Sequence, residues 1–182
     1  MTRTLSGTEV AAHMRSALPE AVVEEAEQWV VVDPSRLVEA ARFLRDDPEL
    51  DCTYLIAVTG VDKLDHFEVV YHLASLNRNH LVIMKTRDLD HDNPEVASIA
   101  ALWHGAHLQE REVYDLMGIR FSGHPDLKRL LLWEGFPGHP LRKDFLGLPG
   151  GLKSGLRRFP KEVPGETGGE FRPQGEGARG AT

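Results

Sequence analysis

Cysteine is nearly absent from this sequence, which holds a single one, Cys52, among 182 residues. One thiol cannot close an intrachain disulfide, and it cannot ligate an iron–sulfur cluster alone. Its expected place at the start of a strand, away from any helix N-terminus, favours a buried and unreactive thiol. A cofactor site built on the cysteines of this chain is therefore excluded.

Long apolar runs are missing as well. The longest, such as residues 54–58 and 81–84, are far shorter than the roughly 20 residues that a membrane-spanning helix needs. The N-terminus has no apolar stretch and no small-residue cleavage site, so we expect no secretory signal. A protein that stays in the cytoplasm is the expectation.

Catalytic and nucleotide-binding motifs are also missing. No Gly-x-Gly-x-x-Gly, Walker loop, Gly-x-Ser-x-Gly elbow or His-Glu-x-x-His pattern occurs. Five histidines near acidic residues raise a metal site as a hypothesis: His91, His104, His107, His124 and His139. His104 and His107 are three residues apart, but no tight third ligand accompanies them, so surface or capping histidines are favoured. A stand-alone metal-dependent hydrolase built on this pair is a remote alternative.

Charge is unevenly distributed along the chain. Residues 1–145 hold 15 Lys and Arg against 24 Asp and Glu, whereas residues 146–182 hold 6 against 4. An acidic body repels phosphate backbones and anionic lipid, which disfavours nucleic acid or direct membrane adhesion. A protein partner is compatible with this balance.

The pattern of apolar residues predicts alternating helices and strands. A capping box at Ser6 and Glu9 predicts a helix to Pro19, and Asp33-Pro34 predicts a second helix to about Arg45. Helical spacing from Pro94 predicts a third and longest helix that ends at Gly118. Four strands are predicted at residues 29–32, 53–59, 66–73 and 81–86, with short links that favour antiparallel neighbours. The sequence thus predicts an α+β fold, a two-layer sandwich with a mainly antiparallel four-stranded sheet and helices on one face.

Glycine and proline divide the rest of the chain. We expect an α+β domain over residues 1–118, an irregular region over 119–145 packed on it, and a flexible tail over 146–182. Ten glycines and four prolines fall in that tail, a composition that buries too little apolar surface to offset the entropy of ordering. Partner-induced ordering of the tail is a hypothesis.

Charged residues gather between positions 110 and 145. The pair Arg111 and Asp115 has i, i+4 spacing, for which a solvated helix end is the plain interpretation. Two later segments, 123–129 and 138–145, each begin Gly-His-Pro and carry a basic pair, which suits docking onto carboxylates of a partner. Ordinary surface loops are the alternative.

These segments read EREVYDLMGIRF (110–121), GHPDLKR (123–129) and GHPLRKDF (138–145), and together they resemble the signature of the complex I 30 kDa subunit family. A weaker resemblance covers roughly residues 20–146. The resemblance implies a non-catalytic structural subunit in the peripheral arm of a proton-translocating NADH:quinone oxidoreductase. It implies no cofactor in this chain, with FMN and iron–sulfur clusters in partner subunits.

The resemblance also implies partners and a location. The expected partners are the 49 kDa-type large subunit of the quinone site and neighbours that bear clusters, on the cytoplasmic side of the cell membrane. An equivalent subunit of a related membrane-bound hydrogenase or photosynthetic-type complex is the alternative. No catalytic, cofactor-binding or metal residues are expected, and the expected docking residues are Glu110, Arg111, Glu112, Asp115, His124, Asp126, Arg129, His139, Arg142, Lys143 and Asp144.

Overall fold

The computed structural model describes residues 3–145, with the side chain of Asp88 left out. Residues 3–133 and 138–145 belong to one compact unit, whereas the turn at 134–137 is assigned to a second. The expectations for the tail at 146–182 lie outside the described residues. The boundary expected at residue 118 stays a prediction.

Twelve elements make up the described chain, in an order that mixes helices and strands. The first half contains β1 (Arg3–Thr4), α1 (Gly7–Ala17), β2 (Val22–Glu25), β3 (Val30–Val32), the 3-10 turn η1 (Pro34–Arg36) and α2 (Leu37–Asp46). The second half contains β4 (Tyr54–Asp62), β5 (His66–Ser75), β6 (His80–Asp90), β7 (Glu95–Ala97), α3 (Ala106–Met117) and β8 (Arg120–Ser122).

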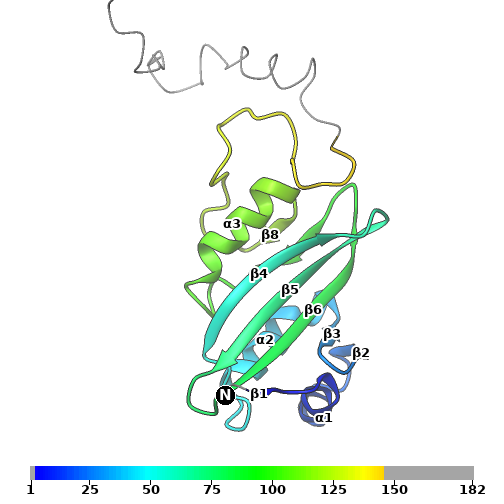
Figure 1. Cartoon of the computed structure of the whole chain (residues 1–182), viewed down its shortest axis with the longest axis vertical. Helices are drawn as coiled ribbons and strands as arrows, with labels where there is room; N and C mark the ends of the chain where they lie inside the picture. Colours follow the sequence, from blue (N-terminus) through cyan, green and yellow to red (C-terminus); the bar gives the residue numbers. More distant parts are fainter. Residues whose placement is uncertain (1–2, 146–182) are drawn as a thin grey trace, which may run out of the picture. The chain divides into compact units, whose positions relative to one another are not determined.

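The main sheet is mixed and has the strand order β2-β3-β6-β5-β4, with β1 also paired to β6. The pairs β4–β5 and β5–β6 are antiparallel, whereas β1 and β3 each run parallel to β6. Figure 1 shows the three long strands β4, β5 and β6 as a twisted ribbon, with α2 behind it and α3 beside β4. A separate parallel pair joins β7 to β8.

One face of the sheet forms the core. Alternate residues of β5, including Phe67, Tyr71 and Leu73, are fully buried, as period-2 alternation requires for a sheet covered on one side. Their cluster includes the apolar stripe of α2 and Val113 of α3. Tyr54, by contrast, is half exposed on β4.

Much of the sequence-based prediction is confirmed. The fold is α+β, and all four predicted strands are present. Ser6 and Glu9 form the predicted capping box of α1, and Asp33 caps the turn that leads into α2. Gly118 ends α3 in the left-handed conformation at φ 77°. Cys52 is buried, and burial raises the pKa of its thiol to about 12.

Three predictions are wrong: the number of strands in the sheet, the wholly irregular region after Gly118, and the start of the third helix. The sheet has six strands and not four, because the short strands β1 and β2 carry too few residues to show a periodic signal. It is mainly antiparallel, as predicted, although β1 and β3 run parallel to β6. The region after Gly118 is not wholly irregular, since β8 pairs with β7. The predicted helix from Pro94 instead begins as β7, and α3 starts only at Ala106.

The cause lies in bonds that the helix pattern does not reveal. The backbone N–H of Ile99 donates to the carboxylate of Glu110 at 2.8 Å, and the N–H of Ser98 donates to Ser122. The indole of Trp103 donates to the carbonyl of Cys52 at 3.2 Å. The apolar residues 96–103 are therefore buried by a folded-back loop, although their spacing is helical.

Candidate functional site

The last turn of α3 carries a buried carboxylate that organises the segment after it. Asp115 is fully buried, and its Oδ1 accepts a hydrogen bond from Arg129 Nη1 at 2.9 Å. Its Oδ2 accepts three backbone N–H groups in succession, from Leu130 at 3.0 Å, Leu131 at 2.7 Å and Leu132 at 2.9 Å. One side chain thus fixes the conformation of residues 129–132.

These donors also hold Asp115 in its charged form. Burial acts to raise the pKa of its carboxyl, but the three N–H donors and the guanidinium of Arg129 outweigh it, so the pKa lies below 3.8. Arg129 also donates to the carbonyl of Gly138 at 3.2 Å. The guanidinium therefore links α3 to both Gly-His-Pro segments.

The four carbonyls that end α3 have no partner within a helix, and the second Gly-His-Pro segment supplies most of the missing donors. Tyr114 O accepts the N–H of Gly118 at 2.9 Å. The next three accept from that segment: Asp115 O from the ring of His139 at 2.9 Å, Leu116 O from the N–H of Leu141 at 3.0 Å, and Met117 O from Nε of Arg142 at 2.7 Å. Residues 139–142 therefore act as the C-terminal cap of this helix.

His139 fits this role as a neutral ring. Burial lowers its pKa, and the nearby Arg129 and Arg142 lower it further, although the hydrogen bond to Asp115 acts to raise it. The proton of the neutral ring lies on Nδ1, because the carbonyl of Asp115 can only accept. A methyl group at Gly118 would lie 2.6 Å from this ring, which explains why the smallest residue is found there. Arg142 also lies over the ring of Phe67 at 5.0 Å, which ties the cap to the sheet.

The start of the signature is equally internal. Glu110 is fully buried, and its carboxylate accepts from Ser98 Oγ at 2.5 Å and from the N–H of Ile99. Burial raises the pKa of Glu110 to about 7 despite these two donors. Arg111 donates to the carbonyls of Lys128 and Arg129 at 3.1 and 2.9 Å. The expected pair of Arg111 with Asp115 is therefore wrong, because Arg129 pairs with Asp115 in its place.

The first Gly-His-Pro segment is fixed through His124. Its Nε2 lies 3.0 Å from the carbonyl of His107, and its Nδ1 accepts the N–H of Asp126 at 3.1 Å. The rings of His107 and His124 are 4.6 Å apart. Both histidines hold structure here, and in the described part of the chain the pair His104 and His107 belongs to no cluster with metal-ligand spacing.

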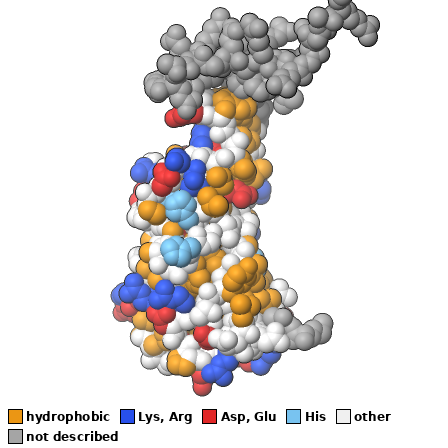
Figure 2. Space-filling view, turned by 90° about the vertical axis from the view of Figure 1, so that its left-hand side faces the viewer, with side chains coloured by type: hydrophobic (Ala, Val, Ile, Leu, Met, Phe, Trp, Pro, Cys, Tyr) orange, Lys and Arg blue, Asp and Glu red, His pale blue; other side chains and the backbone are white. Residues whose placement is uncertain are grey.

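The remaining expected docking residues are exposed. Glu112, Asp126, Lys143 and Asp144 all lie at the surface, and Asp126 pairs with Lys128 at 2.9 Å. Exposed leucines accompany them, namely Leu108 on α3, Leu131 in the loop held by Asp115, and Leu141 in the cap. The side of the molecule that carries α3 shows hydrophobic side chains among charges of both signs (Figure 2).

Two functional side chains had not been singled out from the sequence. Asp62, the last residue of β4, accepts the backbone N–H of Lys143 at 2.8 Å and so anchors the cap to the sheet. Gln109 of α3 accepts the N–H of Val58 in β4 at 2.6 Å and so covers part of an edge strand. No local pattern marks either residue, because their partners lie 81 and 51 positions away.

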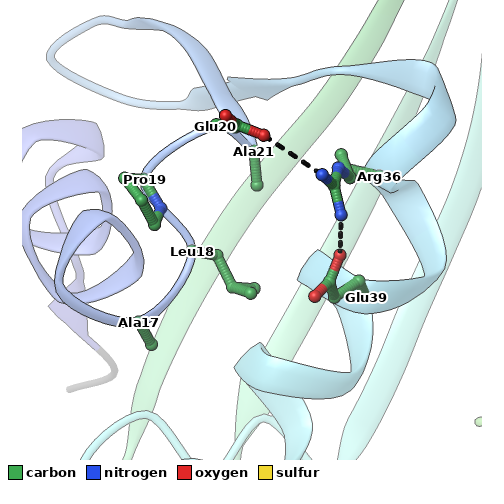
Figure 3. Close-up of a pocket in the computed structure, with 7 residues that line it drawn as sticks. All are labelled: Ala17, Leu18, Pro19, Glu20, Ala21, Arg36 and Glu39. Carbon is green, nitrogen blue, oxygen red and sulfur yellow. Dashed lines mark hydrogen bonds and ion pairs between the residues drawn. The ribbon is translucent and has the colours of Figure 1, made fainter.

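A shallow groove elsewhere lacks catalytic character. It has a volume of about 190 Å³ and lies between the end of α1 and the start of α2 (Figure 3). Arg36 reaches across it to Glu20 at 3.1 Å and Glu39 at 3.0 Å, so its charges are already paired.

In residues 3–145, no helix combines the length and apolar character needed to cross a bilayer.

Known proteins resemble this chain over the region that contains α3 and the two Gly-His-Pro segments. A family profile described as "Respiratory-chain NADH dehydrogenase, 30 Kd subunit" matches residues 30–149, which include α3 and both Gly-His-Pro segments. A protein of Roseiflexus sp. (strain RS-1), named as a subunit of NADH-quinone oxidoreductase, is 46% identical over 147 residues, covering 77% of this chain and 84% of that protein. The protein of the same name from Xanthobacter autotrophicus is 46% identical over 144 residues, covering 75% of this chain and 68% of its own length.

A solved structure shows the same fold. It is a chain in the structure of the membrane-bound sulfane sulfur reductase, described as an archaeal respiratory membrane complex. The similarity has a TM-score of 0.61 at 25% sequence identity, and it covers 76% of this chain and 85% of that chain.

Proposed function

The chain belongs to the family of the 30 Kd subunit of respiratory-chain NADH dehydrogenase, and we propose that it serves there as a scaffold that docks through the end of α3. It is a subunit of an NADH-quinone oxidoreductase, as its relatives are. Electron transfer from NADH to quinone belongs to the assembled complex. Flavin and iron–sulfur clusters are held by partner subunits, and this chain contributes neither a cofactor nor a catalytic residue.

The observation that carries this proposal is the inward direction of the signature's polar groups. Asp115, Arg129, His139 and Arg142 are used to fix loops, with bonds to backbone atoms up to 25 positions away. Each of these bonds restricts a loop to one conformation, so the entropy cost of ordering the loop is met when the chain folds and not when a partner binds. Loops ordered in advance suit a preformed docking surface.

The surface that these bonds present has the composition of a protein interface. Leu131 is 62% exposed and Leu141 is 58% exposed, and both are attached to the last turn of α3. Lys143 and Asp144 are exposed charges that follow Leu141 within three positions. Apolar anchors inside a charged rim are typical of stable protein–protein contacts.

The proposed partner is the large 49 kDa-type subunit that forms the quinone site, with cluster-bearing subunits nearby. We further propose that the complex holds this chain at the cytoplasmic side of the cell membrane, without membrane contact of its own. The support is family membership together with the acidic charge of residues 1–145.

Assembly can test the docking surface directly. Leu131→Asp and Leu141→Asp each put a charge where an apolar contact is proposed, and Lys143→Glu reverses an exposed charge. An interface anchor contributes about 2 kcal/mol or more, so each leucine variant should lower recovery with the tagged large subunit by more than about tenfold. Lys143→Glu should have a smaller effect that grows at low salt.

The matched control is Leu76→Asp, because Leu76 is 71% exposed on the turn between β5 and β6. It should leave recovery unchanged. Full recovery of complex containing both leucine variants would overturn the proposed surface. Arg142 is unsuitable for this test, because its removal disturbs the cap of α3 and not only the surface.

A second candidate is an equivalent subunit of a related membrane-bound complex with another electron donor. The observation that favours it is the structural similarity to a chain of the sulfane sulfur reductase complex. Purification of the native complex separates the two candidates. Co-purification of a flavin subunit that oxidises NADH supports the first, and its absence from an otherwise intact complex supports the second.

A further inference from the structure

Three side chains with metal-ligand atoms meet where the cap of α3 joins the sheet. Asp62 ends β4, His91 follows β6, and Asp144 follows Lys143 in the second Gly-His-Pro segment. One ligand atom from each lies within 4.8 Å of the other two. Within the described residues, no other group of three or more His, Cys, Asp or Glu side chains brings its ligand atoms this close together.

Asp62 supplies a buried negative charge with spare bonding capacity. Its side chain is 2% exposed, and the N–H groups of Leu64 and Lys143 donate to its two oxygens at 2.7 and 2.8 Å. A carboxylate offers about four acceptor positions, so these two donors leave both oxygens able to bind again. No Lys or Arg in the described chain forms an ion pair with it, and His91 is its charged-pair neighbour.

His91 supplies a nitrogen, Nε2, that is shielded from solvent and faces the carboxylate of Asp62. It lies 3.4 Å from Asp62 Oδ1, which is an ion-pair distance but longer than a hydrogen bond of good geometry. The ring is held by stacking on Phe67, with centroids 4.6 Å apart and planes 6° apart. A buried polar atom without a hydrogen bond of good geometry destabilises the fold, and a ligand placed between the two groups would remove that cost.

We propose that Asp62, His91 and Asp144 bind a first-row divalent cation such as Zn²⁺, with water at the remaining position. Zinc bonds to imidazole nitrogen and carboxylate oxygen at about 2.0–2.2 Å, so tetrahedral ligands lie about 3.4 Å apart. The ligand atoms now lie within 4.8 Å of one another, and Asp144 is exposed, so metal binding requires its side chain to rotate toward the other two. An imidazole with two carboxylates suits Zn²⁺ or Mn²⁺ better than Ca²⁺ or Mg²⁺, which prefer ligands that are all oxygen.

The surroundings fit a site of this kind. The two N–H donors on Asp62 fix the carboxylate, and Phe67 fixes the imidazole plane, as outer contacts do around known metal ligands. The bound cation would join the end of β4, the exit of β6 and the Lys143–Asp144 block. It would thereby fasten the cap of α3 to the sheet, independently of any partner subunit.

Zinc titration of the full-length chain tests the proposal. The chain is treated with EDTA, dialysed, and titrated with Zn²⁺ by calorimetry and with Co²⁺ by visible absorption. One saturable site is expected, with affinity at least about tenfold lower in His91→Gln and in Asp144→Asn. Asp144→Asn is the decisive variant, since its side chain is exposed and its loss leaves the fold in place.

Matched controls separate this site from the other histidines. His13→Gln removes a partly exposed histidine that lies 3.5 Å from Glu49, and Asp126→Asn removes an exposed carboxylate of the signature region. Both should bind Zn²⁺ as the unaltered chain does. Absence of saturable binding up to about 1 mM would overturn the proposal, as would equal affinity in the site variants and the controls.

Discussion

Replacement of Asp115 by asparagine tests whether one buried carboxylate holds the signature region. The asparagine keeps one carbonyl acceptor but presents an NH2 group where the carboxylate now accepts. Four donors converge on the carboxylate at 2.7–3.0 Å, and the amide cannot satisfy all of them. The change therefore removes the ion pair between Asp115 and Arg129 and leaves at least one backbone N–H without an acceptor.

The expected loss follows from these contacts. Removal of one partner of a buried ion pair costs about 3–5 kcal/mol, because the other charge stays buried. Asp115 is fully buried but Arg129 is 23% exposed, so water relieves part of that cost. We therefore expect the free energy of unfolding to fall by about 3 kcal/mol, at the lower end of that range. Urea denaturation of the full-length chain at neutral pH measures it.

Two further measurements locate the effect. Asp126→Asn is the control, because its partner Lys128 is 63% exposed and such a surface pair contributes about 0–1 kcal/mol. Hydrogen exchange should speed up first at the amides of Leu130, Leu131 and Leu132. A loss below about 1 kcal/mol for Asp115→Asn, or unchanged protection of those amides, would refute the assignment of Asp115 as their organiser.

Two other changes probe the same region. The pKa of Glu110 is raised from 4.5 to about 7 in the folded chain, so its protonated form stabilises the fold below pH 4.5 and that stability is lost as the pH rises to about 7, by on the order of 3 kcal/mol. Glu110→Gln should remove this pH dependence in urea denaturation, and an unchanged slope would contradict it. Gly118→Ala and Gly123→Ala both put a side chain at positive φ, but only the first meets His139. Gly118→Ala should therefore lower the free energy of unfolding by about 1–3 kcal/mol more than Gly123→Ala does, and it should have the lower thermal midpoint. Equal midpoints for the two alanine variants would show that His139 does not pack against Gly118.

Local patterns predicted the elements whose bonds are local. The capping box at Ser6, the N-cap at Asp33 and the left-handed Gly118 were all predicted, because each depends on partners within four residues. The parallel pairing of β3 with β6 could not be foreseen, since it joins residues more than 50 positions apart.

The helix predicted from Pro94 failed for a related reason. Spacing of i, i+3 and i+4 reports burial on one side of a helix, but a loop that folds back on a core buries the same positions. Glu110 decides between them, because its carboxylate takes the N–H of Ile99 that a helix would have needed. Glu110 therefore joins the loop at residues 98–99 to α3.

The burial of several charged residues between positions 110 and 145 changes the role expected of them. Charged residues at helix ends are usually solvated, and from the sequence the charges of residues 110–145 suited direct contact with a partner. Yet Glu110 and Asp115 are fully buried, while Arg129, His139 and Arg142 are bonded to carbonyls of α3 or of the loops beside it. A partner that docks here would meet Leu131 and Leu141, which these bonds hold in place. Substitution of a buried signature residue should therefore weaken assembly by altering the shape of the surface, and its effect should scale with the loss of protection at residues 130–132.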